Sequence, residues 1–199
     1  EWRMGTGELA FPPGVSLMTG RCAAPALEAA LGAKMADSSR EVYVMVGDGS
    51  YLMLAQEIMT SIQEDVKLTI VLLDNHGHAS IGGLSGSVGA EEFGTKFQMR
   101  NAESGQLDGG YLPTDLAANA ESLGAVVLRP EGKEGLVNAL EEAKGNDRTT
   151  VIFVEVDREV RVGGYDAWWD CPVAEVSTDP EVQRIRTQYE QDLKKERYL

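Results

Sequence analysis

Cysteine, positive charge and long apolar runs are all scarce in this chain of 199 residues. The two cysteines, Cys22 and Cys171, are too few for a disulfide framework and neither belongs to a C-x-x-C pair, so we expect a reducing, cytoplasmic environment. The 18 Lys and Arg residues face 32 Asp and Glu, and a formal net charge of -14 argues against nucleic acid or an anionic membrane as a partner. No apolar run reaches the roughly 18 residues that a membrane-spanning helix needs.

The composition is that of an ordinary soluble domain. Hydrophobic residues make up 43% of the chain and charged residues 25%, and the length suits one domain with a substantial core. Glycines and prolines without apolar periodicity fill the first part of the chain, so residues 1–24 are predicted to be an irregular N-terminal segment and residues 25–199 the domain itself. Because the chain opens without an initiator Met, we expect it to be a truncated piece of a longer protein.

Strand and helix patterns alternate along the domain. Short apolar runs without alternation are typical of strands that are covered on both faces, and apolar residues at helical spacing separate them. This alternation predicts an α/β fold with a parallel sheet and helices on both faces. The expected strands are 42–46, 67–75, 126–130 and 149–156; the expected helices are 25–36, 51–64, 114–124, 131–146 and 180–199; residues 76–112 are expected to be a glycine-rich loop.

Two polar corners follow consecutive strands of this predicted sheet. The first is Gly-Asp-Gly-Ser at 47–50, and the second is Asp-Asn-His-Gly at 74–77, so that Asn75 comes 27 residues after Asp48. In open α/β sheets ligands bind beyond the carboxyl ends of the strands, where such corners meet. Carboxylate, amide and carbonyl oxygens, completed by phosphate oxygens, are the ligands that Mg²⁺ prefers, and glycines let backbone N–H groups approach a phosphate. The pair of corners therefore predicts a site for a metal and a diphosphate.

The first corner taken alone has a simpler explanation. Asp-Gly is among the commonest turn dipeptides, and a Gly-Asp-Gly-Ser sequence by itself is more often a plain turn. A turn requires no partner at the end of the next strand, so Asn75 and the following His-Gly favour the binding site. His76 and His78 are read either as proton carriers at the mouth of this site or as loop histidines that hydrogen-bond to backbone.

The two corners and the strand-helix-strand pattern between them resemble the diphosphate-binding motif of thiamine-diphosphate-dependent enzymes. Within this superfamily the stretches REVYVMVGDGSYLML, KLTIVLLDNHGHASIGGLS, FGT and WWDCPVAEVS resemble the trihydroxycyclohexane-1,2-dione hydrolases of inositol catabolism, which are related to acetolactate synthase. The resemblance implies a hydrolase that opens the ring of the dione, with thiamine diphosphate and Mg²⁺ as cofactors. Acetolactate synthase-like or 2-oxoacid decarboxylase chemistry, and a non-catalytic remnant of the fold, remain the alternatives.

The resemblance also implies roles for individual residues. Asp48 and Asn75 would bind the metal by their side chains and Gly77 by its carbonyl, while Gly47, Gly49, Ser50, Asn75 and Gly77 would contact the cofactor. The activating glutamate of the family belongs to a separate pyrimidine-binding domain, in the same full-length chain or in a partner subunit. We therefore expect no catalytic residue in this chain, a homo-oligomeric assembly and a small-molecule substrate. Ala23 stands where the family often places a Met beneath the thiazolium ring.

Overall fold

A computed structural model describes residues 15–19, 26–160 and 171–195 of the chain. Its contacts divide the chain into two compact units. The first, called here the sheet unit, comprises Glu1–Gly77 and Pro113–Asp157; the second, called the loop unit, comprises His78–Leu112 and Arg158–Leu199. The division of the chain at residue 24 stays a prediction.

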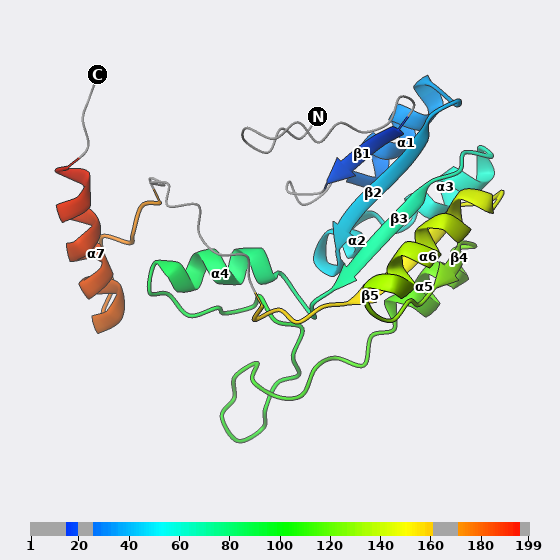
Figure 1. The fold of residues 1–199 in the computed structure, drawn as a ribbon. Coiled ribbons are helices and arrows are strands. Elements are labelled where there is room, and N and C mark those ends of the chain that lie inside the picture. The colour runs from blue at the N-terminus through cyan, green and yellow to red at the C-terminus, as the bar shows by residue number, and fades with distance from the viewer. Residues whose placement is uncertain (1–14, 20–25, 161–170, 196–199) are drawn as a thin grey trace. The chain divides into compact units, whose positions relative to one another are not determined.

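The sheet unit is built on five parallel strands in the order β1-β2-β3-β5-β4 (Figure 1). This arrangement confirms the predicted parallel α/β fold. The strands are β1 (Val15–Thr19), β2 (Glu41–Gly47), β3 (Thr69–Asp74), β4 (Val126–Leu128) and β5 (Thr150–Glu155).

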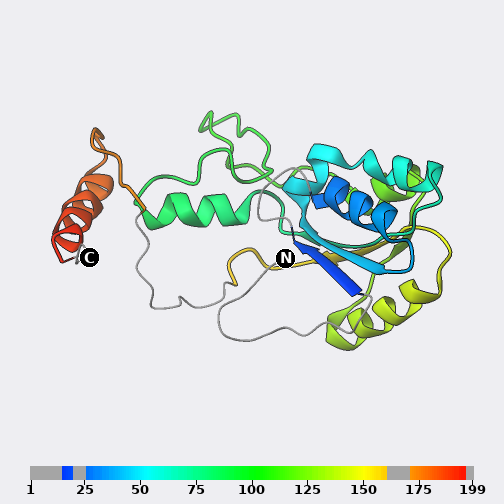
Figure 2. The same ribbon diagram turned by 90° about the horizontal axis from the view of Figure 1, so that it is seen from above.

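Helices cover both faces of this sheet, on opposite sides in Figure 2. The larger core includes Val44, Ile70 and Leu72 of the central strands and the apolar sides of α1, α2, α3 and α5. The smaller core packs α6 against Val71 and Ile152 on the other face. Because β3 is buried on both faces, its sequence is a continuous apolar run rather than an alternation. The helices are α1 (Ala26–Ala36), α2 (Asp48–Leu54), α3 (Glu57–Gln63), α5 (Leu116–Ser122) and α6 (Gly132–Gly145).

Local sequence signals set both ends of α5. The Asp115 side chain accepts a hydrogen bond from the Ala118 N–H and caps α5, and Gly124, with φ 99°, follows its last turn. The single helix expected over 51–64 is instead two helices, because the chain turns at Ala55 and Gln56 through i→i+3 hydrogen bonds.

Two predictions of irregular structure were wrong. Val15–Thr19, inside the segment that was expected to be irregular, pairs in parallel with β2 and forms a strand of the sheet. Within the expected loop 76–112 lies a helix, α4 (Ala79–Ser87), and Gln98 and Tyr111 form an isolated antiparallel bridge. Gly82 of α4 packs closely against Thr95 and Glu92, so tertiary packing overrides the weak helix propensity of this glycine- and serine-rich stretch.

The loop unit also contains α7 (Pro180–Leu193), the expected C-terminal helix. Its N-terminus is capped by Asp179, whose side chain accepts a hydrogen bond from the Glu181 N–H, and Pro180 occupies the first turn. Gly89, with φ 80°, lies against the start of this helix, where a Cβ atom would come within 3.2 Å of the Glu181 backbone. None of the helices in the described residues is long and apolar enough to cross a membrane.

Candidate functional site

The two polar corners lie side by side at the carboxyl ends of β2 and β3. In the register of these strands Gly47 is opposite Leu73, so the next residues along the two segments, Asp48 and Asp74, lie at the same level of the sheet edge. Asp48 is the first residue of α2 and Asp74 the last residue of β3. The structure thus brings together the two corners that were predicted to form one site.

Asp48 joins the corners through its carboxylate. Its Oδ1 accepts a hydrogen bond from the Gly49 N–H at 2.8 Å, within its own corner, and its Oδ2 accepts one from the Gly77 N–H at 2.7 Å, in the other. The side chain is 0% exposed. Gly49 and Gly77 are also buried, whereas Gly47, Ser50 and Asn75 are partly exposed. All six residues predicted to bind the cofactor or the metal therefore belong to these adjoining corners, and their individual roles stay predictions.

Burial raises the pKa of the Asp48 carboxyl to about 6, and a hydrogen bond with the Asp74 carboxyl acts in the same direction. The N–H groups of Gly77 and Gly49 lower this pKa, but they do not outweigh the loss of hydration. Asp74 is itself 4% exposed. Protonation of Asp48, or a cation beside it, would relieve the repulsion between the Asp48 carboxylate and the neighbouring Asp74 carboxyl.

The backbone of the second corner adopts an uncommon conformation. His76 has φ 56° and Gly77 has φ 146°, both in the region that favours glycine. The Asp74 Oδ1 accepts a hydrogen bond from the His76 N–H at 2.9 Å and lies 3.4 Å from the Nδ1 of the same residue. Asp74 had no predicted role, although an Asp two residues before a strained turn position is a recognisable signal of a side-chain-stabilised turn.

Tyr51 joins α2, the helix that begins at the first corner, to α5. It is 0% exposed, and its hydroxyl donates a hydrogen bond to the Asn119 Oδ1 of α5 at 2.8 Å. Burial raises the pKa of Tyr51 to about 12, so the hydroxyl keeps its proton at physiological pH. The contact joins residues 68 positions apart, and no local sequence pattern indicates it.

The donor set of the two corners suits a hard divalent cation. It offers a buried carboxylate from Asp48, an amide oxygen from Asn75 and backbone carbonyls, and a cation would offset the unfavourable burial of the Asp48 charge. The described residues contain no group of three or more His, Cys, Asp or Glu side chains placed to hold a metal. That finding agrees with a site in which a single carboxylate would act together with amide, carbonyl and phosphate oxygens.

His78, the two cysteines and Ala23 were also named from the sequence. The ring of His78 packs edge-on against Phe97, with 5.6 Å between the ring centroids, and the backbone N–H of His78 donates a hydrogen bond to the Thr95 carbonyl. The ring contact fits the reading of a structural loop histidine. Cys171 is a free thiol. Cys22, Ala23 and the two tryptophans of the WWDCPVAEVS stretch, Trp168 and Trp169, lie outside the described residues.

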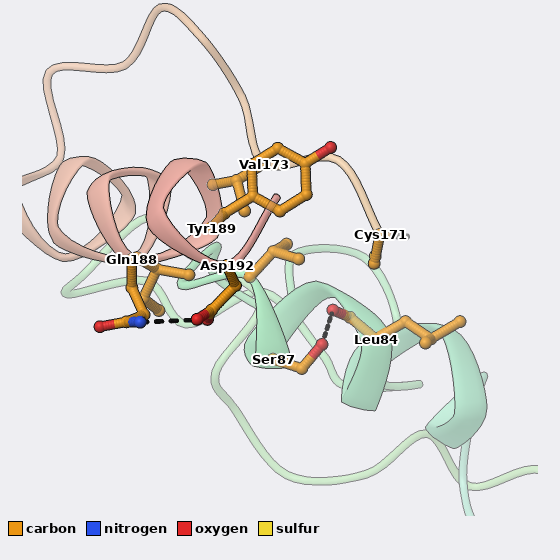
Figure 3. Close-up of a pocket in the computed structure, with 9 residues that line it drawn as sticks. Leu84, Ser87, Cys171, Val173, Gln188, Tyr189 and Asp192 are labelled. Carbon is orange, nitrogen blue, oxygen red and sulfur yellow. Dashed lines mark hydrogen bonds between the residues drawn. The ribbon is translucent and has the colours of Figure 1, made fainter. Parts of the chain in front are cut away.

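Cys171 also lines a cavity of about 400 Å³ within the loop unit (Figure 3). Apolar side chains from α4 and α7, among them Leu84 and Tyr189, form much of its wall, and Gln188 and Asp192 are hydrogen-bonded to one another at its edge. None of the six predicted binding residues lines this cavity.

Comparison with known proteins identifies the family of this chain. Residues 17–154 match the family model described as thiamine pyrophosphate enzyme, C-terminal TPP binding domain. The match covers more than half of the chain and includes both corners, so the chain belongs to the family of thiamine pyrophosphate enzymes as a C-terminal TPP binding domain.

Curated relatives include the 3D-(3,5/4)-trihydroxycyclohexane-1,2-dione hydrolases of Bacillus. A hydrolase of this name from Bacillus cereus is 44% identical over 154 residues, which are 77% of this chain and 24% of that protein. The hydrolase of Bacillus thuringiensis (strain Al Hakam) is 42% identical over 161 residues, which are 81% of this chain and 24% of that protein. The chain thus spans about a quarter of the length of these relatives.

Two solved structures share the fold. A thiamine diphosphate-dependent 4-hydroxybenzoylformate decarboxylase of Rhodococcus jostii RHA1 has a TM-score of 0.53 and 24% identity, over 66% of this chain and 23% of that one. A benzoylformate decarboxylase of Polynucleobacter necessarius has a TM-score of 0.52 and 25% identity, over 68% of this chain and 23% of that one. These similarities support the assignment of the parallel α/β fold.

Proposed function

We propose that this chain is the cofactor-binding domain of a hydrolase that opens the ring of trihydroxycyclohexane-1,2-dione in myo-inositol degradation. The observation that carries the proposal is the pair of corners joined by the Gly77 N–H and the Asp48 carboxylate, in a chain that is 44% identical to curated hydrolases of this name. The chain covers 24% of the length of these relatives. The proposed activity is therefore that of a larger protein to which this domain contributes.

In this proposal Mg²⁺ is held by the side chains of Asp48 and Asn75 and by the Gly77 carbonyl. Backbone groups of Gly47 and Gly49, with the Ser50 hydroxyl, hold the diphosphate, because glycines without a side chain let N–H groups approach its oxygens. Thiamine diphosphate, when bound, supplies the nucleophilic carbon for the cleavage of a C–C bond. The protein's own contribution at this site is to fix the diphosphate end of the cofactor and to balance its charge.

The remaining parts of the active site would come from outside the chain. A pyrimidine-binding domain, in the same full-length protein or a partner subunit, would hold the other end of the cofactor, and a homo-oligomer in the cytoplasm is the proposed setting. The chain alone should therefore show no turnover.

A decarboxylase is the second candidate. The benzoylformate decarboxylase structure has the same fold at 25% identity, and fold similarity alone does not fix the reaction. A non-catalytic domain that keeps the fold but binds no cofactor is the third.

The deciding experiment assays the intact protein that carries this chain against the cyclic dione, pyruvate and benzoylformate, with Mg²⁺ and thiamine diphosphate added. We expect ring opening by the wild type and its loss in Asp48→Ala, while Asp37→Ala, at an exposed aspartate, serves as the matched control. Consumption of a 2-oxoacid without ring opening would favour the decarboxylase. Absence of both turnover and cofactor binding in a folded protein would favour the non-catalytic domain.

A further inference from the structure

The turn after β3 holds a non-glycine residue in a conformation that such residues avoid. His76 has φ 56°, where the Cβ of an L residue crowds the following carbonyl. Gly77, with φ 146°, follows directly and donates its N–H to the Asp48 Oδ2 at 2.7 Å. Any relaxation of His76 toward negative φ would turn the Gly77 N–H away from Asp48.

Asp74 is placed to prevent that relaxation. Its backbone carbonyl accepts a hydrogen bond from the Val156 N–H at 2.8 Å, which fixes it at the end of the sheet. Its Oδ1 accepts the His76 N–H at 2.9 Å, the contact of a side-chain turn that stabilises the backbone two residues ahead. With only 5% of its side chain exposed, Asp74 has little freedom to adopt another geometry.

We infer that Asp74 is a positioning residue: it holds His76 in the left-handed conformation and thereby keeps Gly77 facing Asp48. Its effect on cofactor binding rests on the proposed function, since Gly77 and Asp48 are the proposed metal ligands. The effect on the turn itself does not depend on that function. Asp74 acts through the backbone of the corner and not as a metal ligand.

Three variants separate this role from the alternatives. Asp74→Asn and Asp74→Ala both remove the charge beside Asp48, but only Asn keeps an oxygen that can accept the His76 N–H. The double variant Asp74→Ala/His76→Gly lacks that oxygen too, yet glycine adopts φ 56° without help from a side chain. His76→Gly alone is the control that shows whether the imidazole itself is needed.

The first measurement is site-resolved hydrogen exchange of the Gly77 amide in the intact protein without cofactor. The left-handed conformation of a non-glycine residue is unfavourable by an amount equivalent to roughly a tenfold change in an equilibrium. We therefore expect exchange to be about tenfold faster in Asp74→Ala, near the wild-type rate in Asp74→Asn, and restored in the double variant. Equal rates in Asp74→Ala and the wild type would overturn the inference.

The second measurement is calorimetric titration with thiamine diphosphate at saturating Mg²⁺. Asp74→Ala should weaken binding about tenfold, and both Asp74→Asn and the double variant should bind close to the wild type. Two results would refute the positioning role and identify Asp74 as a ligand or a charge partner. One is that the double variant binds the cofactor no better than Asp74→Ala. The other is that Asp74→Asn and Asp74→Ala lose the same amount of affinity. If the wild type binds no cofactor, the proposed function fails, and the exchange rates alone decide the role of Asp74.

Discussion

Asp48 makes a sharp prediction about stability and pH in the absence of divalent cations. Burial, reinforced by the Asp74 carboxyl, raises its pKa from 3.8 to about 6. Between these two values the folded chain keeps a proton that the unfolded chain has released. The free energy of unfolding must then fall as the pH rises from about 4 to above 6, because the folded state binds more protons in that window.

The size of the effect follows from the shift. A difference of about 2 pKa units, at about 1.4 kcal/mol each, gives a loss of up to ~3 kcal/mol between pH 4 and pH 7. Asp48→Asn cannot titrate and should lack this loss. The absolute stability of the variant is a poorer test, because its amide nitrogen must face the N–H of either Gly49 or Gly77, where the carboxylate accepts hydrogen bonds from both.

The assay is urea unfolding followed by circular dichroism at several pH values, with EDTA present, for the wild type and for Asp48→Asn. Asp37→Asn is the matched control: Asp37 is exposed and its neighbour Ser39 lowers its pKa, so this variant should keep the wild-type decline. Equal declines in Asp48→Asn and the wild type would refute the assignment of the raised pKa to Asp48. The affinity for Mg²⁺ and thiamine diphosphate should depend on pH in the opposite direction to stability. It should weaken as the pH falls through 6, because a proton on Asp48 competes with the cation.

Three further predictions concern packing and helix ends, and urea unfolding measures each. Gly82→Ala should destabilise the chain by about 1 to 2 kcal/mol, since its Cβ would lie 2.8 Å from the Thr95 hydroxyl. Gly86→Ala, on the same helix, meets only an ordinary contact and should stabilise the chain by about 0.5 to 1 kcal/mol. Asp65→Gly should stabilise the chain by about 0.5 kcal/mol, because φ is 53° there. Tyr51→Phe should cost about 1 kcal/mol through the lost hydrogen bond to α5; opposite signs in any of these would contradict the packing described.

The parts of the fold that the sequence predicted well are those that local patterns specify. The apolar runs of β2, β3 and β5 have no competing helical period, and α5 carries both a capping aspartate, Asp115, and a terminal glycine, Gly124. The family motif placed Asp48 and Asn75 at neighbouring strand ends because parallel strands connected by a helix lie side by side in the sheet.

The parts that were missed depend on contacts between distant segments. Val15–Thr19 is a strand because it pairs with β2, while the glycines and prolines around it indicate loop. The helix α4 has weak propensity of its own, and Gly82 fits there because Thr95 and Glu92 pack against it. The contact between the Asp48 and Asp74 carboxyls follows from strand register, which a single sequence does not reveal.

Two non-glycine residues with positive φ show how strain and function can be told apart. Asp65 follows α3, where its N–H donates to the Ile62 carbonyl and the Val66 N–H donates to the Ser61 carbonyl. This is the hydrogen-bond pattern of an ordinary helix end, and it explains the conformation without any ligand.

His76 has no such helix end to complete, because it follows a strand. Its conformation instead depends on Asp74 and directs the next N–H to a buried carboxylate whose pKa is raised. The strained φ of His76 and the buried Asp48 carboxylate lie in adjoining corners that the Gly77 N–H links, and such a combination is expected of a binding site rather than of a scaffold. A cation bound between the corners would stabilise the Asp48 charge and draw the oxygens of both corners together, so the geometry that weakens the free chain would favour the bound state.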